Sequence, residues 1–176
     1  MFDPTAFDNI KVVIEGAIYD KDLEGEVLVT NRKDFVNLAN LSRTFKLAFT
    51  LREASRVNLF AELEIHAGLK NLAAELLEMD DSKTLAGCVI TVVFHIQHRD
   101  DKALFVGIQE VLEEIWGRER MIEQTVKINP LKKCEILANE ISVNFNRLIL
   151  EEQMGDLTEM IDYIVLSLKQ LEDVIE

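Results

Sequence analysis

Two adjoining segments in the middle of the chain alternate apolar and polar residues with a period of two. The first covers Thr44–Glu53 and the second covers Val57–His66, and only three residues separate them. Because side chains alternate between the two faces of a β-strand, each segment would place its apolar residues on one face and its polar residues on the other. Three intervening residues suit a hairpin. The two segments therefore predict an antiparallel sheet.

Other segments rich in β-branched residues predict further strands. Ile10–Tyr19 and Glu26–Thr30 would form a first hairpin, joined by an acidic turn. Asp34 is then expected to cap a short helix that reaches Leu41, since Asp is a favoured N-cap residue. Cys88–Arg99 carries apolar residues on both parities, which is typical of a central strand covered on both faces.

Helices are expected on either side of that central strand. A helical stripe of apolar residues runs over Leu69–Met79, and a second one over Leu104–Gly117, where Asp100-Asp101 would be the N-cap. Strands are then expected at Met121–Ile128, Lys133–Ala138 and Glu140–Arg147. The last two of these strands would form another hairpin.

The last helix has the most regular pattern in the chain, and it is expected to begin at Gly155-Asp156. Its apolar residues have the 4-3-4-3-4 spacing of a coiled-coil seam: Leu157, Ile161, Ile164, Leu168, Leu171 and Ile175. Two interpretations stay open. The band could dock on the chain's own sheet, or it could form a helix–helix interface in a dimer or with a partner.

Together the segments predict one α+β domain over residues 1–176. A mainly antiparallel sheet of hairpins would carry helices packed on it and a C-terminal amphipathic helix. A pseudo-two-lobed arrangement with a join near residues 80–87 is an alternative. In general layout this chain resembles the type III secretion chaperones, which are small acidic dimers with an antiparallel sheet and a terminal amphipathic helix.

The chain is strongly acidic, with a net charge of −13. Phosphate backbones and anionic membrane surfaces attract basic proteins, so neither nucleic acid nor membrane is an expected partner. The excess is uneven, because Glu151–Glu176 contains eight acids and a single base, Lys169. This C-terminal region could mimic nucleic acid and bind a basic protein, although a role in solubility explains the charge as well.

Cys88 and Cys134 are the only cysteines. Two cysteines in a chain of 176 residues do not make a disulfide framework, so we expect buried thiols in a reducing cytoplasm. The first residues show neither a basic start nor an apolar core of a signal peptide. The sequence therefore favours a cytoplasmic protein.

The best candidate site lies on one face of the second alternating segment. Glu62, Glu64 and His66 share that face, and two carboxylates with an imidazole could hold a metal or share a proton. Cross-strand pairing of the two glutamates with Lys46 and Arg52 explains the same residues more simply. We therefore expect no catalytic, cofactor-binding or metal-binding residues here.

Two further sets of polar residues are expected to be structural. His95 and His98 are three residues apart in a strand and should lie on opposite faces. Glu110, Glu113 and Glu114 share one helix without an accompanying histidine, which is typical of a solvated helix face.

The sequence thus favours a non-enzymatic, cytoplasmic protein that binds another protein, in the manner of a chaperone or adaptor, and that forms a homodimer. One alternative is an enzyme or small-ligand binder that uses the polar sheet face around Glu62, Glu64 and His66. The other is an acidic mimic that binds a basic protein. No cofactor is expected.

Overall fold

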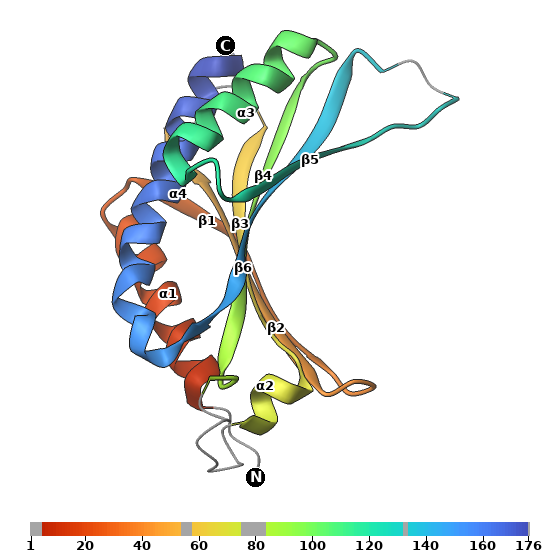
Figure 1. Cartoon of the computed structure of the whole chain (residues 1–176). Coiled ribbons are helices and arrows are strands. Elements are labelled where there is room, and N and C mark those ends of the chain that lie inside the picture. Colours follow the sequence, from red (N-terminus) through yellow and green to blue (C-terminus); the bar gives the residue numbers. More distant parts are fainter. Residues whose placement is uncertain (1–4, 54–57, 75–83, 132–133, 176) are drawn as a thin grey trace.

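The computed structural model describes residues 5–53, 58–74, 84–131 and 134–175 (Figure 1). One antiparallel sheet carries helices, as the α+β prediction requires. In chain order the elements are α1 (Thr5–Leu23), β1 (Val27–Asn37), β2 (Ser42–Leu51), β3 (Leu59–Ala67), α2 (Leu69–Ala74), β4 (Gly87–Arg99), α3 (Lys102–Trp116), β5 (Met121–Lys127), β6 (Ile136–Leu150), a short 3-10 turn (Glu151–Gln153) and α4 (Met154–Ile175).

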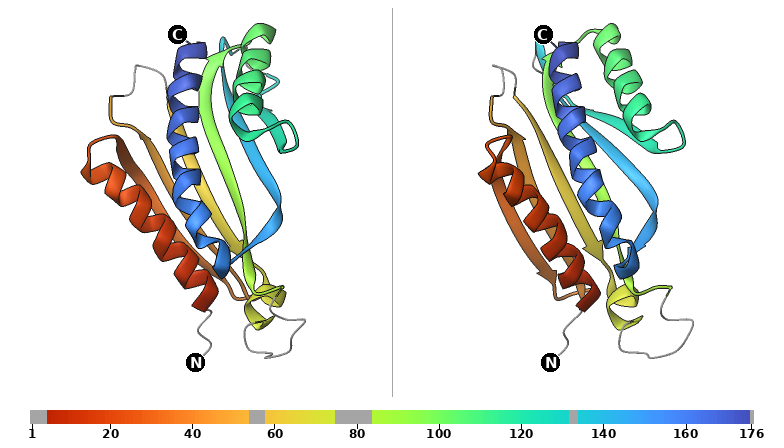
Figure 2. Two further views of the ribbon diagram at one scale, coloured as in Figure 1. Left: turned by 60° about the vertical axis from the view of Figure 1, so that its left-hand side comes forward. Right: turned by 90° about the vertical axis from the view of Figure 1, so that its left-hand side faces the viewer.

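The six strands follow the order β1-β2-β3-β4-β6-β5, and every neighbouring pair is antiparallel. β6 therefore lies between β4 and β5, which precede it in the chain. The long helices α1, α3 and α4 all lie on the same side of the sheet (Figure 1). Among them α4 occupies the middle, with α1 and α3 on its two sides (Figure 2). We call the sheet surface turned away from these helices the open face.

The predicted antiparallel pairing of β2 with β3 is confirmed. Its register pairs Phe45 with Ile65 and Leu47 with Leu63, so one apolar set faces the helices on both strands. All four side chains are fully buried. A shift by one residue would turn them all to the open face, so the alternation itself fixes the register.

The prediction of a strand at Ile10–Tyr19 is wrong, because these residues belong to α1. Ile10, Ile14 and Ile18 are fully buried, and their spacing of four fits one face of a helix as well as one parity of a strand. The exposure of Val12 distinguishes a helix from the predicted strand. Val12 would be buried on that strand face, but it is 64% exposed on the helix.

The expected helix after Asp34 is also absent from this part of the structure. Instead β1 continues to Asn37, and a turn leads into β2, so that β1 and β2 form the first hairpin. Asp34 does not cap a helix. Its carboxylate accepts hydrogen bonds from Lys11 and Arg43, which tie the strand to α1. Pairing with β2 outweighs the local preference for a helix.

Lys133–Ala138 and Glu140–Arg147 do not form a hairpin with each other, and Lys133 lies outside the described residues. Residues 136–138 and Glu140–Arg147 lie in the single strand β6, which pairs with β4 on one side and β5 on the other. Asn139, which separates the two predicted strands, is buried. Its amide donates to His98 Nε2 at 3.2 Å and to Gln124 Oε1 at 2.9 Å, so it belongs to a polar network beneath α3 and is not a turn residue.

The structure around β4 agrees with the predictions in part. β4 is central, but only one of its faces is covered by helices, and Val89 on the other face is 40% exposed. Asp101 caps α3 by accepting the Ala103 N–H at 2.9 Å, as predicted. α2 covers only the start of the helix expected at Leu69–Met79, and the remainder lies outside the described residues.

The apolar band of α4 packs on the chain's own sheet. Five of its six seam residues are buried, namely Leu157, Ile161, Ile164, Leu168 and Leu171. The first of the two interpretations of this helix is therefore confirmed, and these side chains are not available to a partner. Within the described residues, no helix is both long enough and apolar enough to cross a membrane.

Candidate functional site on the open face

The open face is a mosaic of small, polar and a few aromatic side chains. Alternation along each strand turns to this face the residues that do not enter the helix-side core. Its central part is formed by Thr44, Lys46, Ala48, Thr50, Phe60, Glu62, Glu64, His66, Thr91, Val93 and His95.

Lys46 holds both glutamates of the predicted site. Its ammonium lies 3.0 Å from Glu62 Oε1 and 2.6 Å from Glu64 Oε2. Burial disfavours the charged ammonium, but the hydrogen bonds to Glu64 and Glu62 outweigh it and raise the pKa of Lys46. The predicted cross-strand pairing is confirmed for Lys46. The predicted pairing is wrong for Arg52, whose guanidinium donates a hydrogen bond to the carboxylate of Asp22 in α1.

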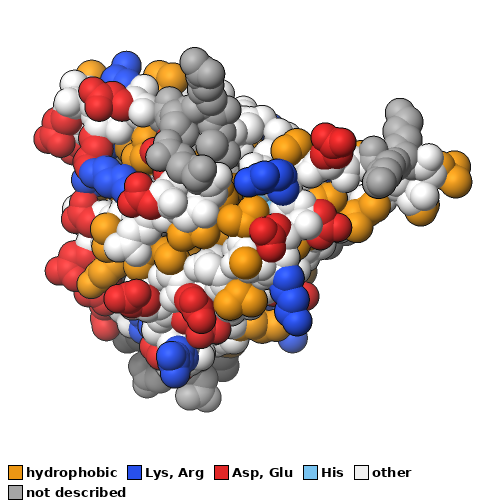
Figure 3. Space-filling view, turned by 90° about the horizontal axis from the view of Figure 1, so that it is seen from above, with side chains coloured by type: hydrophobic (Ala, Val, Ile, Leu, Met, Phe, Trp, Pro, Cys, Tyr) orange, Lys and Arg blue, Asp and Glu red, His pale blue; other side chains and the backbone are white. Residues whose placement is uncertain are grey.

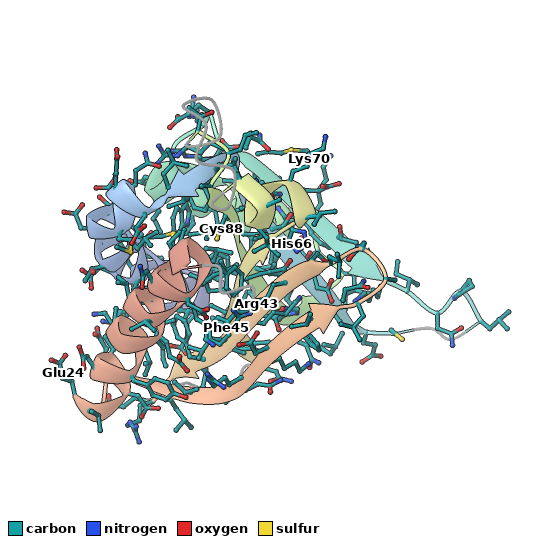
Figure 4. The ribbon with its side chains drawn as sticks, turned by 90° about the horizontal axis from the view of Figure 1, so that it is seen from below. Glu24, Arg43, Phe45, His66, Lys70 and Cys88 are labelled. Carbon is teal, nitrogen blue, oxygen red and sulfur yellow. The ribbon has the colours of Figure 1, made fainter. Side chains whose placement is uncertain are left out.

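His66 lies apart from this ion-paired group. Its Nδ1 is 2.8 Å from Thr44 Oγ1 on the neighbouring strand. Figure 4 shows His66 beside α2, whereas Phe45 lies near α1. The described part of the chain contains no group of three or more His, Cys, Asp and Glu side chains that could hold a metal ion.

The open face also has a depression of about 600 Å³, whose lining includes Lys33, Phe60, Glu62 and His95. The imidazole of His95 stacks on the Phe60 ring with centroids 4.4 Å apart. Its Nε2 is buried and has no hydrogen-bond partner among the described residues. Burial lowers the pKa of His95, against the opposing influence of Glu140 and Glu62. At neutral pH the depression therefore presents an uncharged ring.

Sequence reasoning correctly placed His95 and His98 on opposite faces, because His98 lies on the helix side and is buried. It did not single out His95 as part of a cavity. The position follows only from the register, in which His95 pairs with Phe60 on β3 and Glu140 on β6. Neither partner is near His95 in sequence, so no local pattern could have revealed the depression.

Two arms border the open face. The first is the end of the β1–β2 hairpin, Phe35–Leu41, and the second is the end of the β5–β6 hairpin around Leu131. Both extend away from the helix layer, so the open face lies between them (Figure 1). Each arm exposes apolar side chains, which are Phe35, Val36, Leu38 and Leu41 on the first arm and Ile128, Leu131 and Ile136 on the second.

The acidic charge lies mainly on the opposite side of the molecule. Asp and Glu side chains gather over the helix side, whereas the second arm ends in hydrophobic side chains (Figure 3). The open face is balanced, with four basic residues against four glutamates: Lys33, Lys46, Arg99 and Lys127 against Glu62, Glu64, Glu123 and Glu140. The two faces thus differ in charge as well as in covering.

Comparison with known proteins adds no family to this geometry. No family model matches the chain, and no significant match was found among curated proteins or solved structures. The similarity in layout to type III secretion chaperones therefore stays a prediction.

Proposed function

We propose that this protein binds another protein through the open face, and that the two arms hold an apolar segment of that partner. One observation carries the proposal. An uncovered sheet face lies between two arms whose ends expose apolar side chains. Exposed apolar groups on a soluble surface are typical of interaction sites when they gather rather than scatter.

The exposure at the arm ends is large enough to matter energetically. Leu38 is 80% exposed and Leu131 is 93% exposed. Fully burying one such side chain is worth about 1.5–3 kcal/mol. Two leucines together would contribute roughly 3–6 kcal/mol before the ordering cost of association is subtracted. The arms therefore offer an anchor, while the mixed polar groups between them can form specific hydrogen bonds.

The charge distribution supports the same face. Partners that approach the helix side meet an excess of carboxylates, whereas the open face is close to neutral and carries both signs of charge. Like charges at an interface disfavour association, and balanced charges give specificity. A second copy of the chain would also avoid repulsion only if it docked by this face.

The two alternative functions have less support. Glu62, Glu64 and His66 do not converge, because Lys46 and Thr44 hold them. The acidic mimic needs an unbroken strip of carboxylates along α4. Leu166 and Lys169 interrupt that exposed strip, and the Asp162 carboxylate lies 2.7 Å from Lys21 Nζ on α1.

The proposal can be tested with leucines at the two arm ends. The variant Leu38→Ser/Leu131→Ser removes one exposed side chain from each arm. The control Val12→Ser/Leu23→Ser changes two exposed apolar positions on α1, at 64% and 87% exposure. The probe is reduced, carboxymethylated α-lactalbumin, an acidic polypeptide that cannot fold and therefore offers apolar segments without charge attraction.

We expect the arm variant to weaken binding of this probe at least about tenfold, since tenfold corresponds to about 1.4 kcal/mol. The α1 control should bind like the wild type. Sedimentation of the protein alone identifies the occupant. A dimer that the arm variant abolishes would make a second copy the occupant of the same face. Equal probe binding by all three proteins, with no effect of the arm variant on sedimentation, would refute the proposal.

A further inference from the structure

A second cavity, of about 290 Å³, lies on the helix side of the sheet. It opens between the C-terminal end of α3, the first turns of α4 and the strands β4 and β6. Its buried floor is apolar and consists of Ile90, Trp116, Ile149, Leu157 and Met160. Such a volume lies at the lower end of the range for small-molecule sites, so it suits a ligand with a single ring or a branched chain.

One wall of this cavity is built by an irregularity in β6. Between the Thr91–Asn144 and Val89–Leu148 pairs, β4 contributes one residue and β6 contributes three. Asn146, at the centre of the three, has φ 51°, a left-handed conformation that few residues other than glycine adopt. Strand bulges and unusual backbone angles are found preferentially near functional sites.

The bulge brings Phe145 and Arg147, on either side of Asn146, to the same cavity. In a regular strand Phe145 and Arg147 would each pair with a residue of β4, but here neither of them has such a pair. An aromatic ring and a guanidinium from the same strand therefore both line the cavity. Phe145 also lies edge-on to the Trp116 indole, with centroids 5.6 Å apart.

A second guanidinium, that of Arg120, reaches the cavity from the turn after α3. It lies over the Phe145 ring, 5.3 Å from the centroid. Its Nε is buried without a hydrogen-bond partner in the described part of the chain, and the nearest carboxylate oxygen, of Glu119, is 3.9 Å away. A buried donor without a partner is costly, which points to a ligand acceptor.

Arg147 likewise has no ion pair or hydrogen bond to any described residue. Its side chain is exposed, so its hydrogen-bond donors are available to a ligand acceptor. Arg147 and Arg120, whose Nε lacks a hydrogen-bond partner in the described part of the chain, thus line the same cavity.

We propose that this cavity binds a small organic carboxylate with an apolar, ring-sized body. Arg120 and Arg147 would bind the carboxylate, because the planar guanidinium matches carboxylate geometry and forms charge-assisted hydrogen bonds. Phe145 and Trp116 would pack against the body. Asp156 and Glu159 are exposed at the rim, so the carboxylate could belong either to an α-amino acid, whose ammonium they would meet, or to a simple arylalkanoic acid.

Trp116 supplies a direct readout, because it is the only tryptophan. Its indole N–H is fixed by donation to Ser167 Oγ at 3.0 Å, so a change in its emission would report on the cavity. The first probe is 3-phenylpropionate. Its matched controls are 3-phenylpropionamide, which has the same body without charge, and acetate, which has the charge without the body. We expect a saturable fluorescence change for 3-phenylpropionate and at least about tenfold weaker binding of both controls.

The arginines are tested with Arg147→Gln and Arg120→Lys. Each should weaken 3-phenylpropionate binding at least about tenfold, since Arg147→Gln removes the positive charge and Arg120→Lys removes the planar fork that can bind both carboxylate oxygens. The control Arg118→Gln changes a guanidinium in the same turn that is 90% exposed and outside the cavity, and it should bind normally. Because Arg147 is exposed, its replacement should leave the thermal unfolding midpoint unchanged, which separates binding from folding.

L-phenylalanine distinguishes the two sources of the carboxylate. Tighter binding than 3-phenylpropionate would assign the site to an amino acid, and weaker binding would assign it to an arylalkanoic acid. The proposal fails if neither compound gives a saturable change up to millimolar concentration, if the amide binds as well as the acid, or if Arg147→Gln binds like the wild type.

Discussion

Replacing Phe49 by alanine tests the central assignment of the fold. Phe49 is fully buried on β2, and it pairs with Val29 on β1 and with Ala61 on β3. Phe→Ala substitutions in protein cores cost about 3–5 kcal/mol, depending on how far the surroundings can close the cavity. Here the cross-strand partners are small or rigid and cannot refill the ring's volume. We therefore expect a loss in the upper half of this range, about 4–5 kcal/mol.

The measurement is equilibrium unfolding in urea, followed by far-UV circular dichroism, with the slope m compared between proteins. Phe35→Ala is the matched control, since Phe35 lies on the adjacent strand but is 48% exposed. It should cost less than about 1 kcal/mol, as surface substitutions usually do. A loss below about 1 kcal/mol for Phe49→Ala, or equal losses for the two variants, would refute the assignment of the buried face.

Two further predictions concern α4 and the open face. Leu168→Asp should unfold the chain rather than dissociate a dimer, because it places an unpaired carboxylate at a fully buried position. Circular dichroism measures whether the variant is folded, and sedimentation measures its oligomeric state. A folded, soluble variant would contradict the packing of α4. His95 should titrate below the usual imidazole pKa of 6.5 in an NMR titration, with His95→Asn used for assignment. Since its folded-state pKa is lowered, its contribution to stability is complete above pH 6.5 and declines as the pH falls towards the folded-state pKa. The variant should lose less stability than the wild type over that interval, and titration at or above 6.5 would contradict the burial of the ring.

The sequence predicted best where one period fits and the others do not. In β2 and β3 only a strand places Phe45, Leu47 and Phe49 on one face and Leu59, Ala61 and Leu63 on one face, and the structure buries all six. Isoleucines spaced by four, as in α1, fit one face of a strand and one face of a helix. The strand prediction therefore depended on their β-branched side chains, and it was wrong.

Asp34 shows a different limit of sequence reasoning. Local chemistry favours a helix cap there, but pairing of β1 with β2 over the neighbouring residues fixes an extended backbone. That pairing is a tertiary interaction, which no local window contains.

The helix-side cavity could not be predicted from the sequence. Arg120, Phe145 and Arg147 meet there only because β6 inserts beside β4 and bulges at Asn146. The alternating pattern of β6 gives no sign of the two extra residues. Register and irregularity depend on contacts between segments that are far apart along the chain.

The placement of β6 and α4 has a consequence for how this protein can be assembled. β6 lies between β4 and β5, and α4 lies between α1 and α3, so each layer is completed by an element that inserts between two earlier ones. On the ribosome, a growing chain that ends before Ile136 would leave the edge of β4 unpaired and β5 without its neighbour. Such an intermediate exposes strand edges and core surface until the final residues emerge. Folding should therefore be cooperative over the whole chain, and its rate should be governed by closure of these long-range contacts.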